Sequence, residues 1–535
     1  MTTLLTNGWV HSPSHPDATA MAVRDGVVVW LGEDAAGRAE FPRADVVDLD
    51  GGFVAPGFVD SHIHVTATGL SLTGLDLRPA RSRHHCLRLI AEYGAAHPGE
   101  PVWGHGWDDS SWPDANPPST ADLDEVLGDR PGYLARVDVH SALASTSLRR
   151  RVPGLPAASG FSGPGPLSAE AHHLVRAAAR DLLSPAQRRQ AQVAALDAAA
   201  ANGIVAVHEC AGPDIGGLGD WQALQALAGA HGVEVTGYWG QAVTSPAQAN
   251  AVLAETGARG LAGDLFVDGA LGSRTAWLRE PYHDAPDCTG NCYLDVAAIT
   301  AHIRACTEAG APAGFHVIGD AAVAAVVEAF EQVVADLGTT SVARCGHRLE
   351  HLEMVTAEQA AQLGAWGVIA SMQPAFDAAW GGAHGMYAER LGVDRGARLN
   401  PFSLLASQGV PLAFGSDAPV TPLDPWAGVR AAAQHQTNGS AVSWRAAFAA
   451  ATRGGWRAAG VRDGLTGTLV PGAPASYAVW DVAEPSLTED RPAHSAAARW
   501  STDRTARVAR LPRFGADNAT PHCRQTVHRG VTLHG

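Results

Sequence analysis

The sequence contains no lysine, so every positively charged side chain other than histidine is an arginine. This absence excludes any site that needs a lysine amine or a carboxylated lysine. Cysteine is scarce as well: seven cysteines are scattered along 535 residues, and their odd number argues against a disulfide framework and fits reduced thiols. The closest pair, Cys288 and Cys292, has no second pair to complete a zinc site.

Long apolar segments are also missing. No stretch approaches the run of about 18 apolar residues that a membrane span needs. Residues 1–10 show neither a cationic leader nor an extended apolar run, so we expect no secretory signal and a cytoplasmic location. Acidic residues outnumber basic ones, 54 to 38, and the net charge of −16 repels nucleic acid and anionic lipid. We therefore expect a small-molecule substrate and no nucleic acid or membrane partner; homo-oligomer formation is left open.

What the sequence does contain is an alternation of apolar β-type runs with Ala-rich helical segments. In one such unit, Ser184 caps a helix with Pro185 in its first position, the helix runs to Asn202, and a strand follows at 204–207. Roughly eight units of this kind fit between residues 51 and 465. We predict an α/β fold in which this region closes as a (β/α)₈ TIM-like barrel.

The two ends of the chain have a different pattern. Residues 1–50 and 466–535 consist of short β-rich runs between turns, including a hairpin signal at Asp25-Gly26. We predict that both ends pair into one small β-sandwich domain. Residues at about 97–165 are rich in Trp, Pro, Asp and Gly and interrupt the βα alternation. For them we predict a long loop insertion over one mouth of the barrel.

Five side chains that can bind a metal stand at the ends of predicted strands. His62 and His64 are alternate residues, so both imidazoles point to the same side. Alone, this pair is a weak signal, because 24 histidines in the chain produce roughly one such pair by chance. His316, His351 and Asp417 each end a further apolar run, and barrel active sites form at the C-terminal ends of strands. A lone histidine is more often a core or surface residue, but the five together predict a metal site.

The insertion and nearby segments supply candidates for substrate contact. Trp107 offers an apolar surface, Arg136 a partner for an acyl oxygen or carboxylate, and His140 a further polar group. Packing within the loop is at least as good an interpretation for the tryptophan. Arg274 either meets the substrate or pairs with an internal carboxylate. Glu209, at the end of its predicted strand, either faces the site or forms structural hydrogen bonds.

The order of these motifs resembles the amidohydrolase superfamily, and within it the branch of the N-substituted formamide deformylases, amidohydrolase family 3. The resemblance runs almost end to end. It rests on nine segments, 55–64, 106–108, 118–122, 136–140, 268–276, 316–320, 348–351, 371–374 and 415–417. It implies a metal held by His62, His64, His316 and His351, with Asp417 as ligand and proton shuttle.

One element implied by the resemblance is absent. Many relatives place a carboxylated lysine, which bridges two metals, where this chain has Asp264. In one account, the histidines other than His351 bind a single Zn²⁺ together with Asp417, and His351 polarises the scissile carbonyl. In the other, Asp264, Asp268 or Glu209 supplies a bridging carboxylate to a two-metal site. We favour one ion, because aspartate is much shorter than a carboxylated lysine.

The chemistry follows from the ion, because bound Zn²⁺ lowers the pKa of water from 15.7 to about 7. We predict a hydrolase in which metal-bound hydroxide attacks a carbon–nitrogen bond other than a peptide bond, in a small amide or N-substituted formamide. Asp417 would carry the proton to the departing nitrogen, and His351 would offset charge on the tetrahedral oxygen. A deaminase acting on an amidine or ring C–N bond is the alternative. A non-catalytic barrel scaffold is disfavoured, because a scaffold needs no such set of residues.

Overall fold

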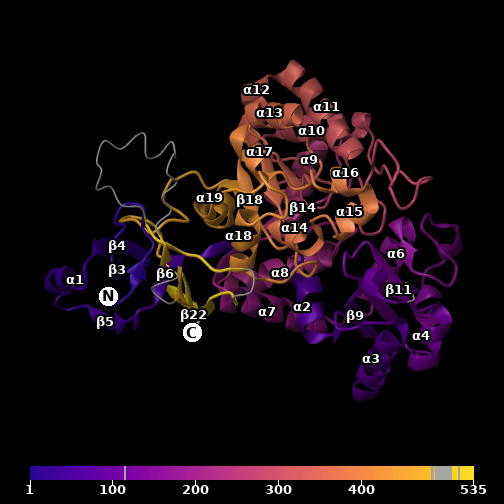
Figure 1. Ribbon diagram of the computed structural model, residues 1–535, viewed down its shortest axis with the longest axis horizontal. Coiled ribbons are helices and arrows are strands. Elements are labelled where there is room, and N and C mark those ends of the chain that lie inside the picture. The colour runs from indigo at the N-terminus through magenta and orange to yellow at the C-terminus, as the bar shows by residue number, and fades with distance from the viewer. Residues whose placement is uncertain (114–115, 483–486, 489–508, 516–518) are drawn as a thin grey trace.

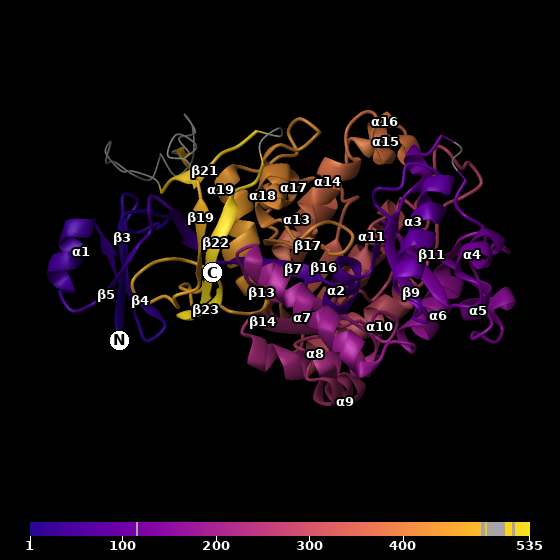
Figure 2. The same ribbon diagram turned by 90° about the horizontal axis from the view of Figure 1, so that it is seen from below.

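The computed structural model describes residues 1–113, 116–482, 487–488, 509–515 and 519–535. Three regions follow one another across the molecule (Figure 1). The indigo N-terminal and yellow C-terminal strands lie together at one end, and the purple segment with α3, α4 and α6 lies at the other. The barrel strands lie between them, as the view from below also shows (Figure 2).

The barrel is built from parallel strands that form two sheets. One sheet has the order β14-β13-β7 and the other the order β15-β16-β17-β18. The strands are β7 (Phe58–Ile63), β13 (Ile204–Ala211), β14 (Glu234–Trp239), β15 (Gly314–Val317), β16 (Arg348–His351), β17 (Ile369–Met372) and β18 (Leu412–Phe414). Single parallel bridges join the two sheets, Ile63 to Ala418 on one side, and Tyr238 to Gly260 and Leu261 to Ala313 on the other.

This is the predicted α/β TIM-like arrangement, with one difference. The hydrogen-bonded ladders form two sheets linked by single bridges and not one continuous sheet. The segment around residues 260–267 explains the gap between them. It contains Gly260 and Gly263, the latter at φ +79°, and glycines weaken the extended conformation that a ladder needs.

Helices follow the barrel strands and cover their outer side (Figure 2). Two predicted helix starts are present: α7 (Pro185–Ala201) and α13 (Ala357–Ala365) begin with capping boxes at Ser184 and Thr356. The others in this region are α2 (Val65–Thr73), α8 (Leu218–His231), α9 (Pro246–Thr256), α10 (Val296–Ala309), α11 (Asp320–Leu337), α12 (Thr339–Cys345), α14 (Pro374–Trp380), α15 (Met386–Leu391), α16 (Val393–Gly396), α17 (Phe402–Ser407), α18 (Pro425–Ala433), α19 (Trp444–Ala449) and α20 (Gly455–Ala458). None of the described helices combines the length and the apolar character that crossing a membrane requires.

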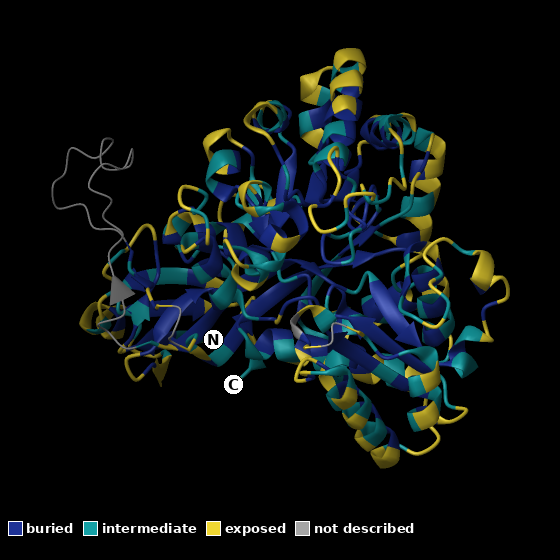
Figure 3. Cartoon of the chain, turned by 45° about the vertical axis from the view of Figure 1, so that its right-hand side comes forward, coloured by how far each residue is buried: buried dark blue, intermediate teal, exposed yellow. Residues whose placement is uncertain are grey.

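The strands of the barrel and the inner sides of its helices are buried (Figure 3). One apolar cluster extends from Phe58 in β7 through Phe315 in β15 to Phe414 in β18. Helices α2 and α7 pack especially closely. A Cβ atom on Gly69 would lie 1.7 Å from the carbonyl oxygen of Ala191, so no larger residue fits between these two helices.

Both ends of the chain contribute to the terminal sheets. The first sheet contains β1 (Thr2–Thr6), β3 (Ala20–Arg24), β4 (Val27–Gly32) and β5 (Asp45–Asp48), with α1 (Asp34–Glu40) beside it. The second joins β2 (Trp9–Val10) and β6 (Phe53–Pro56) to β19 (Tyr477–Asp481), β22 (His522–His528) and β23 (Val531–His534). The predicted hairpin joins β3 to β4, and Asp25 and Gly26 both have positive φ, as a type I′ turn requires.

One buried cluster contains side chains from both terminal sheets, including Leu5, Met21, Val54 and Val479. Their packing as a β-sandwich stays a prediction, as do the domain boundaries at residues 50 and 466. Strand β6 continues the terminal sheet past residue 50. Part of the predicted terminal segment 466–535 lies outside the described residues, which include the short pair β20 (Leu487–Thr488) and β21 (Leu511–Pro512).

The insertion at 97–165 is not the predicted long loop. Its residues contribute to a five-stranded sheet of order β12-β11-β10-β9-β8. The strands are β8 (Leu75–Asp76), β9 (Val102–Trp107), β10 (Gly132–Arg136), β11 (Ser141–Ala144) and β12 (Leu167–Ser168), with α3 (Arg83–Ala96), α4 (Thr120–Leu127), α5 (Thr146–Arg149) and α6 (Ala169–Arg180). The strands are short and mix glycine and polar residues with apolar ones, so composition alone suggested a loop.

Candidate metal centre

The ends of four barrel strands bring the five predicted metal ligands together. His62 lies in β7, His316 in β15 and His351 at the end of β16. His64 follows β7 directly, and Asp417 comes three residues after β18. All five are buried, and the imidazole centroids of His316 and His351 are 4.4 Å apart, those of His62 and His351 5.0 Å.

Asp264 lies at the centre of the four histidines. Its oxygens are 3.4 Å from His62 Nε2 and 3.1 Å from His64 Nε2. The oxygen near His62, Oδ1, is also 3.7 Å from His316 Nδ1 and 3.8 Å from His351 Nε2. Two ligands of a tetrahedral zinc ion with bonds of about 2.0–2.1 Å are themselves about 3.4 Å apart. These separations therefore match those between neighbouring ligands of one ion.

Asp417 is a second carboxylate close to His62 and His64. Its Oδ1 is 3.4 Å from His62 Nε2 and 3.2 Å from His64 Nε2. Burial alone would lower the pKa of His64, but the carboxylates of Asp264 and Asp417 raise it to about 9. Burial likewise opposes ionisation of Asp264, yet His62 and its neighbours hold the pKa of this carboxyl well below its usual range. The two buried carboxylates are therefore stabilised by positive charge on their neighbours. A divalent cation can supply this charge in place of protons on the histidines.

Hydrogen bonds on the outer side fix the protonated nitrogen of three histidines. Each donates to an oxygen: His62 Nδ1 to Glu350 at 2.9 Å, His351 Nδ1 to Gln373 at 2.7 Å, and His316 Nε2 to the carbonyl of Gly269 at 3.2 Å. Their other nitrogens are directed inward. Within the described residues these nitrogens, together with Oδ1 of Asp264 and of Asp417, are buried without a hydrogen-bond partner. Such a set of inward lone pairs fits a divalent metal, whose ligating histidines commonly donate their other N–H outward.

A buried ion pair holds Glu350, and so orients His62. Arg348 donates to the two Glu350 oxygens at 2.5 and 2.8 Å. It also donates to the Ser61 carbonyl at 2.6 Å and to the Ser371 hydroxyl at 2.8 Å. Burial opposes ionisation of Glu350, but Arg348 holds the pKa of this carboxyl well below its usual range.

Two of the five ligands have an unfavourable backbone conformation. His351 has φ 69° and Asp417 has φ 54°. Such conformations cost non-glycine residues about 1–3 kcal/mol each and persist where the surroundings enforce them, often at functional sites. For Asp417 one such constraint is visible: its N–H donates to the His62 carbonyl at 2.7 Å.

The other two predicted bridging carboxylates have different partners. Asp268 accepts hydrogen bonds from the N–H groups of Ile318, Gly319 and Trp277 at 2.8–3.0 Å. Its burial raises its pKa to about 7. Glu209 accepts from the Val65 N–H at 2.7 Å, and burial raises its pKa to about 7 as well. Of the three candidates, Asp264 is the one that shares groups of closely spaced ligand atoms with the histidines.

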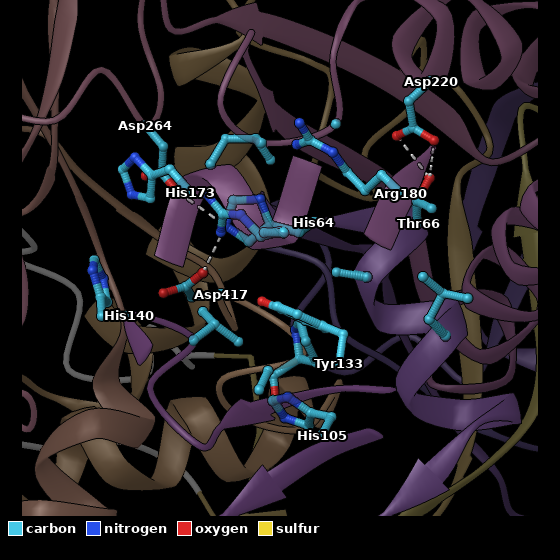
Figure 4. Close-up of a pocket in the computed structure, with 18 of the residues that line it drawn as sticks. His64, Thr66, His105, Tyr133, His140, His173, Arg180, Asp220, Asp264 and Asp417 are labelled. Atoms are coloured by element: carbon cyan, nitrogen blue, oxygen red, sulfur yellow. Dashed lines mark hydrogen bonds and ion pairs between the residues drawn. The ribbon is translucent and has the colours of Figure 1, made fainter. Parts of the chain in front are cut away.

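A cavity opens directly onto these ligands. It is lined by His64, Asp264 and Asp417 together with Tyr133, His140 and Phe266 (Figure 4). His140, predicted to contact substrate, has its ring centroid 5.2 Å from that of His316. Burial and the neighbouring His316 keep the pKa of His140 well below its usual range, so its imidazole is neutral at pH 7.

The three other predicted substrate residues have internal partners. Trp107 is buried in the apolar core of the insertion, and its Nε1 donates to the Leu134 carbonyl at 2.8 Å. Arg136 lines a second cavity beside the centre, but it pairs with Asp108, Asp109 and Asp138 at 2.5, 3.4 and 2.9 Å. Arg274 pairs with Asp284 at 2.6 Å. For Arg274 this is the internal carboxylate that the sequence left open as one of two alternatives.

Several residues at the site were given no role from the sequence. Glu350 and Gln373 lie within the segments 348–351 and 371–374 that carry the family resemblance. Their role, to accept a hydrogen bond from His62 and from His351, becomes visible only in the structure. His173, Arg176 and Arg180 line the main cavity from α6. Their spacing of three and four residues on one helix was the available signal, because it places all three on one face.

A family model for the amidohydrolase family matches residues 45–534. The chain belongs to this family. The amidohydrolase is thus a metal-dependent hydrolase of carbon–nitrogen bonds. It shares 26% sequence identity with the crystal structure of an uncharacterised metal-dependent hydrolase from Pyrococcus furiosus, with a TM-score of 0.69 over 90% of this chain and 98% of that one.

Curated relatives agree with this placement. The amidohydrolase is 27% identical over 522 residues to protein LONG AFTER FAR-RED 3 of Arabidopsis thaliana, covering 89% of this chain and 88% of the relative. It is 28% identical over 462 residues to the putative amidohydrolase YtcJ of Bacillus subtilis, covering 78% and 82%. A shorter match is to an N-substituted formamide deformylase from Arthrobacter pascens. It has 28% identity over 134 residues, which cover 24% of this chain and 25% of the relative. The resemblance stated from the motifs is confirmed.

Proposed function

We propose that this amidohydrolase hydrolyses an amide or an N-substituted formamide bond in a small molecule. One observation carries the proposal: inward-directed nitrogens and carboxylate oxygens, buried without hydrogen-bond partners, converge beside a cavity. A scaffold protein would not leave such atoms unpaired, because each costs about 1–3 kcal/mol of desolvation. The short match to a formamide deformylase supports the substrate class.

The proposed cation is Zn²⁺, because imidazole and carboxylate donors suit this ion. Asp264 belongs to two groups of closely spaced ligand atoms, one with His62 and His64 and one with His316 and His351. We therefore propose two cation positions that share the Asp264 carboxylate. The single ion favoured from the sequence, where aspartate was judged much shorter than a carboxylated lysine, stays the alternative prediction.

A bound divalent metal would supply Lewis acidity, which makes water acidic enough to react at neutral pH. The residues of the chain then handle the proton and the substrate. Asp417 lines the cavity next to His64, and its carboxylate accepts the proton of the attacking water and returns it to the departing nitrogen. His140, neutral and facing the same cavity, donates a hydrogen bond to the carbonyl oxygen of the substrate.

A panel of amides and N-substituted formamides tests the reaction class. We expect the metal-loaded protein to release formate or another carboxylate from at least one compound, and Asp417→Asn to abolish this release. Release of ammonia from amidines or ring amines without any amide hydrolysis would instead show the deaminase reaction.

The metal content of Asp264→Asn tests the shared carboxylate. We expect two ions per wild-type chain and at most one in the variant, because an amide is a much poorer ligand than a carboxylate. Asp287→Asn, a change at an exposed aspartate, is the matched control and keeps both ions. Elemental analysis of the purified proteins gives the number directly. A variant that binds as much metal as the wild type would contradict the role of Asp264.

A small-molecule substrate is proposed together with this function, because a cavity lies beside the ligands, and no nucleic-acid partner is proposed, because the net charge is −16. The cytoplasmic location stays a prediction, and homo-oligomer formation stays open. The β-sandwich packing of the terminal sheets is proposed from their common apolar cluster.

A further inference from the structure

A second charged group faces the cavity from the insertion. Helix α6 turns apolar residues such as Ala171 and Val175 toward the core of the insertion. His173, Arg176 and Arg180 stand on another face, at positions i, i+3 and i+7, and line the cavity that contains the metal ligands. Helix α6 thus adds two guanidinium groups to the active-site cavity.

Neither guanidinium is paired with a carboxylate in the described part of the chain. Arg176 Nη2 donates to the Asp214 carbonyl at 2.7 Å, and Arg180 Nη2 donates to the Pro213 carbonyl at 3.4 Å. Nε of Arg176 and Nη1 of Arg180 are buried and have no partner among the described residues. Buried donors without acceptors are costly, so a ligand that supplies acceptor oxygens would bind favourably here.

The carboxylates that share this side of the cavity already have partners. Asp220 accepts a hydrogen bond from the Thr66 hydroxyl at 2.9 Å, as Figure 4 shows, and forms an ion pair with Arg188, whose Nε lies 3.1 Å from Asp220 Oδ1. Glu209 accepts from the Val65 N–H at 2.7 Å. Among the described residues, no carboxylate forms an ion pair with either cavity arginine, although the charges of Asp220 and Asp181 act on Arg180 from a distance.

Several groups that line the cavity with the arginines are neutral or apolar. Burial lowers the pKa of His173 to about 3, so this histidine carries no charge at pH 7. Burial and the neighbouring Arg176 lower the pKa of Arg180 to about 10, which still leaves it protonated. Trp103, Tyr133 and Phe266 line the same cavity and offer apolar surface.

We propose that Arg176 and Arg180 bind a carboxylate of the substrate, so that the amidohydrolase acts on an amide with an apolar body and a free carboxylate. This inference rests on the proposed function, because it places the amide at the metal ligands of the same cavity. A guanidinium matches the planar carboxylate, with two parallel N–H···O bonds. The net charge of −16 disfavours a multiply charged anion.

Two matched probes test the proposal by kinetics, N-formylphenylalanine and its neutral carboxamide, N-formylphenylalaninamide. We expect wild-type protein to prefer the carboxylate probe. Arg180→Gln and Arg176→Gln should each lower kcat/KM for that probe by about 10- to 100-fold, mainly through KM, because a charge-assisted hydrogen bond is lost. The neutral probe should change by less than about 3-fold, which also shows that the variants fold.

Two further variants sharpen this experiment. Arg180→Lys keeps the charge but not the planar fork, and should recover part of the lost kcat/KM. Arg189→Gln removes an exposed arginine of α7 and should leave both probes unaffected. Equal losses for the charged and neutral probes in the α6 variants would overturn the proposal.

Binding without turnover separates this proposal from the hydrolase reaction itself. Calorimetric titration of the metal-loaded proteins uses 3-phenylpropanoate and, for comparison, 3-phenylpropanamide. If no formamide is hydrolysed but Arg180→Gln weakens 3-phenylpropanoate by about 10-fold or more, the carboxylate site stands and the proposed reaction fails. If the neutral probe is hydrolysed but 3-phenylpropanoate binds wild type and variant equally, its carboxylate binds only the metal and the arginine site is excluded.

Discussion

Arg348 is completely buried, and none of its hydrogen bonds within the described residues is to a predicted metal ligand. Its guanidinium holds the Glu350 carboxylate, and Glu350 accepts the Nδ1 proton of His62 at 2.9 Å. This chain of contacts leaves His62 Nε2 free to face the centre. The residues behind the ligands therefore determine which nitrogen each histidine presents to the metal.

Glu350→Gln should weaken metal binding and stability together. The change removes the charge that pairs with Arg348, and breaking a buried ion pair from one side costs about 3–5 kcal/mol. Loss of such an orienting carboxylate typically lowers metal affinity about 10- to 100-fold. Competition with a chelator and thermal unfolding measure the two effects. Glu308→Gln, at an exposed position, is the control, and a Glu350→Gln protein with unchanged metal affinity would contradict this role.

Among single residues, the sequence predicted best which ones lie at the ends of barrel strands. The apolar runs before His316, His351 and Asp417 predicted their places, because a run of buried residues ends where the strand reaches the mouth of the barrel. The partners of charged residues could not be predicted in this way. Arg274 meets Asp284 and Arg136 meets Asp138 through loop conformations that no local pattern encodes.

Helices α2 and α7 pack closely together beside the centre. Gly69 in α2 faces the Ala191 backbone of α7, and α2 begins directly after His64. Any displacement of α2 therefore moves a predicted ligand.

Gly69→Ala should destabilise the protein, although alanine favours helices. The new Cβ would lie 1.7 Å from a backbone oxygen that cannot rotate away, and overpacking of this kind costs about 1–3 kcal/mol or more. Gly229→Ala is the matched control: it lies in α8 with nothing within 4 Å of the added atom, and should stabilise by up to about 1 kcal/mol. Denaturant unfolding of both variants measures the difference, and equal effects would refute the packing argument.

Among the elements, long helices with caps were predictable and the short strands of the insertion were not. Ser184 and Thr356 predicted the starts of α7 and α13, because a capping residue and its partner three residues later can be recognised in the local sequence. Strands such as β11 (Ser141–Ala144) have four residues and acquire their stability from sheet partners distant in sequence. Composition therefore suggested a loop where the structure has a sheet, and the cavity face of α6 was overlooked.

At the scale of the whole molecule, the terminal segments pack against the barrel. The ring of His11 contacts Phe448 of α19 at 5.1 Å between centroids, and its Nδ1 donates to the Arg510 carbonyl at 2.8 Å. Burial lowers the pKa of His11 to about 4. Folding therefore keeps this imidazole neutral at pH values where the unfolded chain protonates it.

This difference predicts a stability loss in mild acid. Below pH 6.5 the unfolded state binds a proton at His11, whereas the folded state does not bind it until about pH 4. The free energy of unfolding therefore falls as the pH decreases from 6.5 to 4, and this group has no effect above that range. The expected share of this one group is on the order of 3 kcal/mol. His11→Gln should flatten the pH dependence of the unfolding temperature between pH 6.5 and 4, whereas His15→Gln, at an exposed position, should not. If the unfolding temperatures of His11→Gln and of the wild type fall equally between pH 6.5 and 4, His11 does not cause the loss of stability.

The aspartate at the middle of the four imidazoles also bears on how the enzyme matures. A carboxylated lysine exists only after its amine has captured carbon dioxide, so centres built on it depend on dissolved bicarbonate. Asp264 is a finished carboxylate as soon as the chain is translated, and there is no lysine to modify. With Asp264 in the proposed metal site, assembly of that site would need no carbon dioxide to complete its carboxylate.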